Sequence, residues 1–299
     1  MTRHRVALLG LPGTGKSTFI GALWTLIDDF QYPHVVELDV RGDRSYVQSL
    51  AEKVVSAVEI TRTPTASAGV LEVDVEFTGD GPATLSIADR SGEQLRELVE
   101  DRHWLPLLSD EIDSIDSILL FVNPSTLESP IPIRAMSEIG LNGGVRPETS
   151  TSPAEVNERA ASDEIEGQVS ASEDPRIFRN RKACTAARLV DGLENLLDAK
   201  SDDQPVSVAV VVSAFDLVEQ RTPLDWLSDR LPALRAFLDC NPDRVSWTVF
   251  GVSAQGGKLP DAKDELLDRG DVVDRCYAQR ANGDSTPLSE PVRWAVGWR

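Results

Sequence analysis

A glycine-rich segment near the start of the chain carries the residue types that bind nucleotide phosphates. Residues 10–17 read GLPGTGKS, which fits the spacing GxxxxGK[ST] of a phosphate-binding loop. Glycines let the backbone turn its N–H groups toward phosphate oxygens, and the start of a following helix adds favourable partial charge. Lys16 is predicted to hold the β- and γ-phosphates and to assist catalysis, and the Ser17 hydroxyl is predicted to ligate Mg²⁺. The predicted phosphate-contacting residues are Gly10, Gly13, Thr14, Gly15, Lys16, Ser17 and Thr18.

The neighbouring residues favour phosphate binding over a simple turn. An apolar run at residues 5–9 precedes the loop and is typical of a strand, while Phe19, Leu23 and Leu26 follow it at helical spacing. Strand, loop and helix in this order are the context that the motif requires. A glycine-rich turn that only joins a strand to a helix is the simpler alternative. The loop does not identify the base, because ATPases, GTPases and small-molecule kinases all use it.

Three later segments place polar residues directly after predicted strands. Residues 85–89 end in Asp89, whose carboxylate can hold Mg²⁺ through a water, and Gly92 follows to complete the pattern DxxG. Residues 206–212 are the most β-rich segment of the chain, and the residues SAFD at 213–216 come after them. A further strand at 245–252 is followed by Ser253 and Ala254. Four strand ends of this kind in one chain indicate a nucleotide site.

In this order the segments resemble those of TRAFAC-class P-loop GTPases, and the wording of the loop, the long acidic insertion and the terminal Trp-containing helix resemble the bacterial double-GTPase group. The resemblance implies that the Gly92 N–H reaches the γ-phosphate and that Asp216 accepts hydrogen bonds from guanine N1 and N2. It also implies that a backbone N–H at Ser253 and Ala254 contacts guanine O6. Ala214 departs from the [NT]KxD pattern, whose lysine lies across the base. The implied ligands are Mg²⁺ and GTP or GDP, with ATP left open by Ala214, and the implied role is in a bacterial multi-gene conflict or signalling system.

Hydrolysis is expected to be slow without a partner. Ras-type GTPases place a glutamine directly after DxxG to orient the attacking water, whereas this chain has Glu93 there and Gln94 one position later. Glu93 could orient water as an acceptor, but its charge is unfavourable beside a γ-phosphate. Thr63 is predicted to complete the Mg²⁺ shell from the first switch segment, with Thr65 as the alternative. Arg62 is interpreted as an exposed loop residue.

Two other functions stay open at this point. A P-loop small-molecule kinase would use the same loop, with a basic lid formed by Arg176, Arg179, Arg181 and Lys182. Such a kinase has no need for Asp216 or Ser253 after later strands. A nucleotide-bound scaffold, which recruits a protein effector without meaningful turnover, is consistent with Glu93 and Ala214.

The elements that carry these residues predict an α/β fold. Strands and helices alternate along the chain, which argues for a doubly wound, mainly parallel sheet in a single domain spanning residues 1–299. Two alternating runs at 70–77 and 83–88 predict an early β-hairpin that adds one antiparallel pair. Helices are predicted at 93–108, around Trp226 to Leu238, and at the end of the chain around Trp294 and Trp298. Residues 124–176 are polar and acidic and predict an insertion.

Composition limits the partners of the chain. The formal net charge of −19 repels phosphate backbones and anionic lipid headgroups, so nucleic acid is excluded as a partner. No apolar run approaches the about 20 residues that a membrane-spanning helix needs, so no membrane insertion is expected. The short segment before the first strand leaves no room for a signal peptide, and a cytoplasmic location is expected. A protein effector or activator is the expected partner, with the oligomeric state open.

Overall fold

The structure is a computed structural model that describes residues 3–28, 35–41, 44–60, 70–77, 81–89, 112–129, 183–201 and 204–297. Strands and helices alternate through these residues, so the predicted α/β class is confirmed. The predicted helix at 93–108 and residues 130–176 of the predicted insertion lie outside the described residues.

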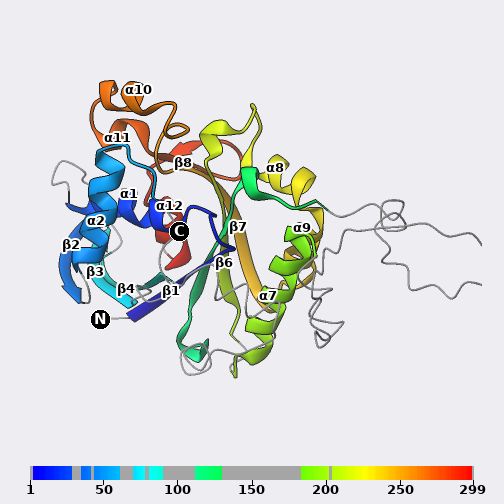
Figure 1. Ribbon diagram of the computed structural model, residues 1–299. Coiled ribbons are helices and arrows are strands. Elements are labelled where there is room, and N and C mark those ends of the chain that lie inside the picture. Colours follow the sequence, from blue (N-terminus) through cyan, green and yellow to red (C-terminus); the bar gives the residue numbers. More distant parts are fainter. Residues whose placement is uncertain are drawn as a thin grey trace, which may run out of the picture.

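Within the described residues, nine strands form one sheet in the order β2-β3-β4-β1-β5-β6-β7-β8-β9 (Figure 1). The strands are β1 (Arg3–Leu9), β2 (Val35–Arg41), β3 (Val70–Phe77), β4 (Gly81–Asp89), β5 (Ser117–Val122), β6 (Val206–Ser213), β7 (Val245–Ser253), β8 (Tyr277–Gln279) and β9 (Ser285–Thr286). The five strands from β4 to β7 in this order are parallel to one another. The predicted doubly wound sheet therefore forms the centre of the molecule.

Both edges of the sheet are antiparallel, which the sequence pattern anticipated only in part. The predicted hairpin is confirmed as β3 and β4, which pair along their whole length. Three further antiparallel pairings, β2–β3, β7–β8 and β8–β9, were not predicted. The strands β8 and β9 contain three and two residues, which is too short for an alternating pattern to be read from the sequence.

One face of the sheet is covered by the helix that follows the glycine-rich loop and by the last helix of the chain. The helices on this face are α1 (Lys16–Asp28), α2 (Arg44–Val55), α11 (Val272–Arg275) and α12 (Glu290–Ala295). Trp294 lies in α12 as predicted, whereas Trp298 lies outside the described residues. Among the described residues, no helix combines the length and apolar character needed to cross a bilayer.

The opposite face is covered by α7 (Thr185–Ala199), α8 (Pro223–Arg230) and α9 (Pro232–Cys240). The last two correct the single helix predicted around Trp226 to Leu238. Leu231 separates them, and Pro232 begins the second one. Proline has no N–H to continue the hydrogen bonds of the first helix, and its ring clashes with the preceding turn, so the helix restarts at a new angle.

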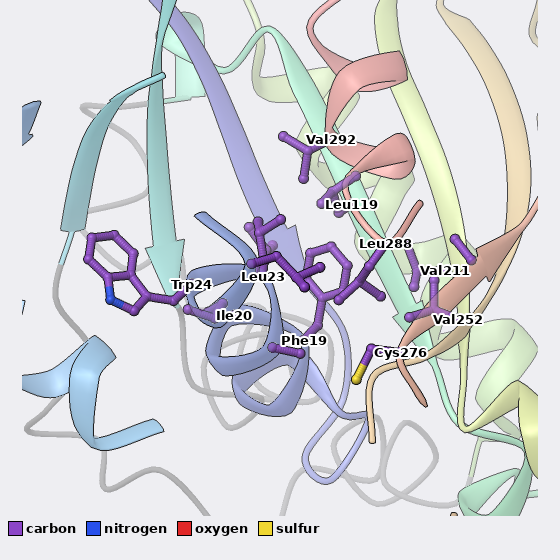
Figure 2. Close-up of a cluster of buried hydrophobic side chains, with 14 of the residues drawn as sticks. Phe19, Ile20, Leu23, Trp24, Leu119, Val211, Val252, Cys276, Leu288 and Val292 are labelled. Atoms are coloured by element: carbon purple, nitrogen blue, oxygen red, sulfur yellow. The ribbon is translucent and has the colours of Figure 1, made fainter. Parts of the chain in front are cut away.

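Side chains alternate between the two faces along the central strands, and each face has its own apolar core. On the α1 face, Phe19 and Leu23 gather with Leu119 of β5 and Val252 of β7 (Figure 2). The rings of Phe19 and Phe121 meet edge to face with centroids 5.3 Å apart. This packing fixes the start of α1 against the middle of the sheet, and with it the loop that precedes α1.

Replacing Leu119 with alanine is expected to lower the free energy of unfolding by about 2–5 kcal/mol, because the side chain is fully buried and its loss leaves a cavity. Urea unfolding followed by tryptophan fluorescence measures the change. Leu267→Ala is the matched control, since that leucine of α10 (Lys263–Asp268) is 46% exposed and should change stability by less than about 0.5 kcal/mol. Equal losses in the two variants would contradict the assigned core.

Candidate functional site

The carboxyl ends of the five parallel strands lie along one edge of the sheet. The strand order reverses at β1. The chain places β4 on one side of β1 and then β5 on its other side. In open α/β sheets, ligands bind beyond the carboxyl ends of the strands at such a reversal. The residues at or directly after these ends are residues 10–17 after β1, Asp89 of β4, Asn123 after β5, residues 213–216 at β6 and residues 253–254 at β7. Segments far apart in the sequence thus share one edge.

The glycine-rich loop lies so close to the neighbouring strands that two of its residues must be glycine. A Cβ atom on Gly10 would lie 2.7 Å from the carbonyl oxygen of Phe121 in β5. Gly15 has a φ of +87°, and a Cβ there would lie 3.2 Å from the Cβ of Ser213 in β6. Gly13 has a φ of +75° with open space around its missing Cβ. The loop therefore has a closely packed inner side and an open outer side, the form expected of a phosphate cradle.

Lys16 begins α1, and its ammonium group lies over the loop. The side chain is only 6% exposed, and Nζ donates hydrogen bonds to the carbonyl oxygens of Gly10 at 2.9 Å and Leu11 at 3.2 Å. The hydroxyl of Thr14 lies 3.4 Å from Nζ and donates to the Leu11 carbonyl at 2.8 Å. A buried cation and the N-terminus of a 13-residue helix therefore provide positive potential at the same place. This combination favours a bound anion.

Of the residues predicted to hold Mg²⁺, Ser17 and Asp89 lie within the described part of the chain. Ser17 and Thr18 lie partly exposed in the first turn of α1. Asp89 is the last residue of β4, and its backbone is in register with Leu8 of β1, two residues before the loop. A hydroxyl and a carboxylate are the hard oxygen ligands that Mg²⁺ prefers, so these residue types fit the ion. The predicted residues Thr63, Gly92 and Glu93 lie outside the described residues.

Asn123, for which no role was predicted, fixes the loop to the sheet, and Ser213 fixes the ends of two neighbouring strands to each other. Asn123 directly follows β5, and its Nδ2 donates a hydrogen bond to the carbonyl of Gly13 at 3.2 Å. Its Oδ1 accepts from the backbone N–H of Ser125 at 2.9 Å, which holds the amide in place. Ser213 is buried beside Gly15, and its hydroxyl donates to the carbonyl of Val122 at 3.2 Å. A polar residue directly after a buried strand was the available signal for Asn123.

Asp216 is presented by a short turn that packs tightly on β7. Ala214 has left-handed backbone angles, φ 48° and ψ 41°, and begins the 3₁₀ turn η4 (Phe215–Leu217). The ring of Phe215 covers Gly251, where a Cβ atom would lie 2.4 Å from the ring. Asp216 is partly exposed, and within the described residues its carboxylate makes no hydrogen bond. The turn therefore presents, at the edge of the sheet, a carboxylate whose oxygens can accept hydrogen bonds from a ligand.

Ser253 is the last residue of β7, and Ala254 directly follows it. The Ser253 hydroxyl is fully buried and accepts a hydrogen bond from the Gly256 N–H at 3.1 Å, so it closes the local turn. The carbonyl of Ala254 accepts a hydrogen bond from the Cys276 thiol at 3.0 Å. Burial raises the pKa of Cys276 to about 12; Arg275 acts in the lowering direction and the Asp216 carboxylate raises it further. The thiol thus stays protonated at neutral pH and remains a donor.

Comparisons with known proteins point to one family. The model of the family described as Double-GTPase 1 matches residues 7–295 of the chain. The chain is also similar to the solved structure of the Arl6 BBS3 small GTPase from Trypanosoma brucei with bound nucleotide analogue GppNp, at 12% identity over 89% of this chain and 96% of that chain, with a TM-score of 0.40. A second similar structure is the bacterial selenocysteine-specific elongation factor EF-Sec, at 16% identity over 91% of this chain and 30% of that chain, with a TM-score of 0.31. No curated protein matches the chain.

Gly251→Ala should displace Phe215, because the added Cβ would overlap the ring. The free energy of unfolding is expected to fall by about 1–3 kcal/mol, as for other overpacked cores. Urea unfolding of Gly251→Ala, Phe215→Leu and the double variant measures the coupling. The double variant should lose less stability than the sum of the single changes, since the leucine removes the overlapping ring carbons. Simple additivity would show that the two residues do not compete for the same space.

Proposed function

We propose that this chain, which belongs to the Double-GTPase 1 family, is a Mg²⁺-dependent guanine-nucleotide switch with slow intrinsic GTP hydrolysis. Family membership makes it a GTP-binding protein with the P-loop fold. The observation that carries the finer proposal is the shared edge of the sheet, where a phosphate cradle lies at the strand reversal after β1 and a carboxylate acceptor follows β6, two strands away.

The glycine-rich loop and the start of α1 form the phosphate side of the proposed site. The backbone of residues 10–17 curls around the β-phosphate, and Lys16 transfers its hydrogen bonds from the loop carbonyls to phosphate oxygens. Ser17 and Asp89 would hold Mg²⁺ together with Thr63, and the ion would neutralise charge on the β- and γ-phosphates. The tight inner packing of Gly10 and Gly15 supports this arrangement, because it brings the loop backbone against the strand ends and leaves open space beside Gly13.

Asp216 and the segment after β7 form the base side. The carboxylate of Asp216 accepts hydrogen bonds from guanine N1 and N2, which adenine cannot supply in the same pattern. A backbone N–H at Ser253 and Ala254 donates to guanine O6. The Ser253 hydroxyl already accepts a bond from Gly256, and this supports a role for the backbone, rather than the side chain, in base contact.

Hydrolysis requires water to attack the γ-phosphorus while the bond to the oxygen between the β- and γ-phosphates breaks, giving GDP and phosphate. Lys16 stabilises the negative charge in this step. Glu93 can orient the water, but its own charge opposes approach to the γ-phosphate, so intrinsic turnover is slow. Gly92 senses the γ-phosphate through its N–H, and its release after hydrolysis moves the following segment. A protein effector or activator, encoded in a bacterial multi-gene system, reads this change.

The first test is a titration of nucleotide-free protein with labelled GTP and ATP, with and without Mg²⁺. GTP should bind tightly in a Mg²⁺-linked manner, with ATP at least about tenfold weaker, a gap of about 1.4 kcal/mol. Lys16→Ala should abolish binding of both nucleotides. Lys200→Ala is the matched control, because that lysine donates to Ile115 at the opposite edge of the sheet and should bind as the wild type does. Wild-type affinity in Lys16→Ala would overturn the proposed phosphate site. Equal binding of GTP and ATP by the wild type would overturn the proposed base site.

Asp216→Asn tests the proposed base acceptor, because it should weaken GTP binding and strengthen XTP binding. The amide has an N–H₂ donor that suits the carbonyl at C2 of xanthine, so the variant should lose its preference for GTP and bind XTP better than the wild type does. Competition titrations with GTP and XTP measure both effects. Asp225→Asn is the control and should keep GTP preference, because that carboxylate lies in the first turn of α8 and accepts a hydrogen bond from the capping residue Thr222. An unchanged GTP preference in Asp216→Asn would remove this residue from the base site.

A further inference from the structure

The base side of the site lacks the long side chain that the [NT]KxD pattern supplies. Position 214 is alanine, whose single methyl group cannot extend across a purine ring. In its place the structure has an element directly beside the segment after β7. Strand β8 lies beside the end of β7 (Figure 1). The two strands pair antiparallel, with Tyr277 opposite Ser253. An aromatic residue therefore lies at the level of the predicted guanine contacts.

The pleat of the strands puts Tyr277 on the same face as Phe215, the residue before Asp216. Val252, Cys276 and Ala278 belong to the core on the α1 face. Side chains alternate along a strand, so Gly251 and Tyr277 face the other way. That is the face on which Phe215 covers Gly251, one residue before Asp216. Tyr277 and Asp216 thus flank the same end of β7, one from each neighbouring strand.

The electrostatic environment agrees with this placement. Burial raises the pKa of the Tyr277 phenol, and the Asp216 carboxylate raises it further. This direction agrees with the positions of the two residues, one on β8 and one in the turn after β6. Within the described residues, neither group makes a hydrogen bond, and both residues are partly exposed. An aromatic ring and an acidic acceptor are therefore available on the two segments that neighbour the end of β7.

The residues before Tyr277 hold it firmly. Arg275 is 3% exposed, and its Nη2 donates to the carbonyls of Val54 at 2.7 Å and Val55 at 3.1 Å, while Nη1 donates to Leu266 at 3.1 Å. Cys276 donates to Ala254 at 3.0 Å. These bonds fix the start of β8 to α2, to α10 and to the segment after β7. A ring presented by such a backbone is preorganised for a ligand.

We propose that Tyr277 is a base-binding residue of the nucleotide site, where its ring covers the guanine base near Asp216 in place of the lysine side chain that Ala214 does not supply. This inference rests on the proposed function. Aromatic rings stack on nucleobases and also shield the neighbouring hydrogen bonds from water. The ring contacts the base alone, so its contribution must be absent from the binding of phosphates.

The experiment compares GTP with inorganic tripolyphosphate, each in the presence of Mg²⁺, as ligands of the wild type and of Tyr277→Ala, Tyr277→Leu and Tyr277→Phe. Tyr277→Ala and Tyr277→Leu should bind GTP about tenfold more weakly and tripolyphosphate as the wild type does. Tyr277→Phe keeps the ring and should remain within about twofold of the wild type for both. Tyr277→Leu retains most of the buried volume, so it serves if Tyr277→Ala does not fold. Gln279→Ala changes the next residue on the same face of β8 and is the control, with unchanged GTP affinity.

The GTP and tripolyphosphate affinities of the Tyr277 variants decide whether the ring covers the base. A tenfold loss for GTP that spares tripolyphosphate supports the base-covering role. Equal losses for both ligands would reveal a distorted site and overturn it, as would unchanged GTP affinity in both Tyr277→Ala and Tyr277→Leu. Wild-type protein that binds tripolyphosphate but not GTP would overturn the proposed function together with this inference, whereas failure of the tyrosine variants alone leaves the proposed function intact.

Discussion

Close backbone packing between the glycine-rich loop and the central strands is the constraint on which the rest of the structure depends. A side chain at Gly10 would collide with the Phe121 carbonyl, and one at Gly15 would crowd Ser213 on a backbone whose φ of +87° already disfavours it. Such an approach is possible only if β1, β5 and β6 are adjacent and end at the same level. Adjacent parallel strands in turn need helical connections that cover both faces of the sheet. The two apolar cores are therefore a requirement of the loop geometry.

Hydrogen bonds at the strand ends convert this packing into a fixed arrangement. Asn123 attaches the loop to the end of β5, and Ser213 attaches the end of β6 to that of β5. On the other side, Cys276 attaches the segment after β7 to β8. Each bond joins two segments that are distant in sequence and adjacent in space. Side-chain hydrogen bonds thus connect the edge of the sheet from the phosphate side to the base side.

The site is electrostatically opposite to the molecule as a whole. The chain carries a formal net charge of −19, which disfavours polyanions at its surface. At the loop, however, the buried ammonium group of Lys16 and the partial positive charge of the α1 N-terminus act over short distances. A small anion that enters the loop experiences these local charges, and an extended polyanion experiences the acidic surface. The contrast favours a mononucleotide over a nucleic acid.

The sequence alone determined the features that depend on neighbouring residues. The phosphate-binding loop, the helix after it, the hairpin of β3 and β4 and the strands β6 and β7 were predictable because spacing and apolar periodicity are local properties. The break at Pro232 was also present in the sequence, although the leucine periodicity across it suggested one helix. The order of the motifs along the chain was also sufficient to indicate a resemblance to the double-GTPase group, because motif order is a property of the sequence alone.

Only the tertiary structure decided which strand ends meet and what fills the space between them. The roles of Asn123 and Tyr277 depend on β5 lying beside β1 and on β8 pairing with β7, and both neighbours are set by packing between distant segments. The requirement for glycine at position 251 comes from the Phe215 ring packed against it, a contact that the sequence does not reveal. Local patterns fix the direction in which a side chain leaves its strand. The partner that it meets is fixed by the burial of whole faces of the sheet, a property of the complete fold.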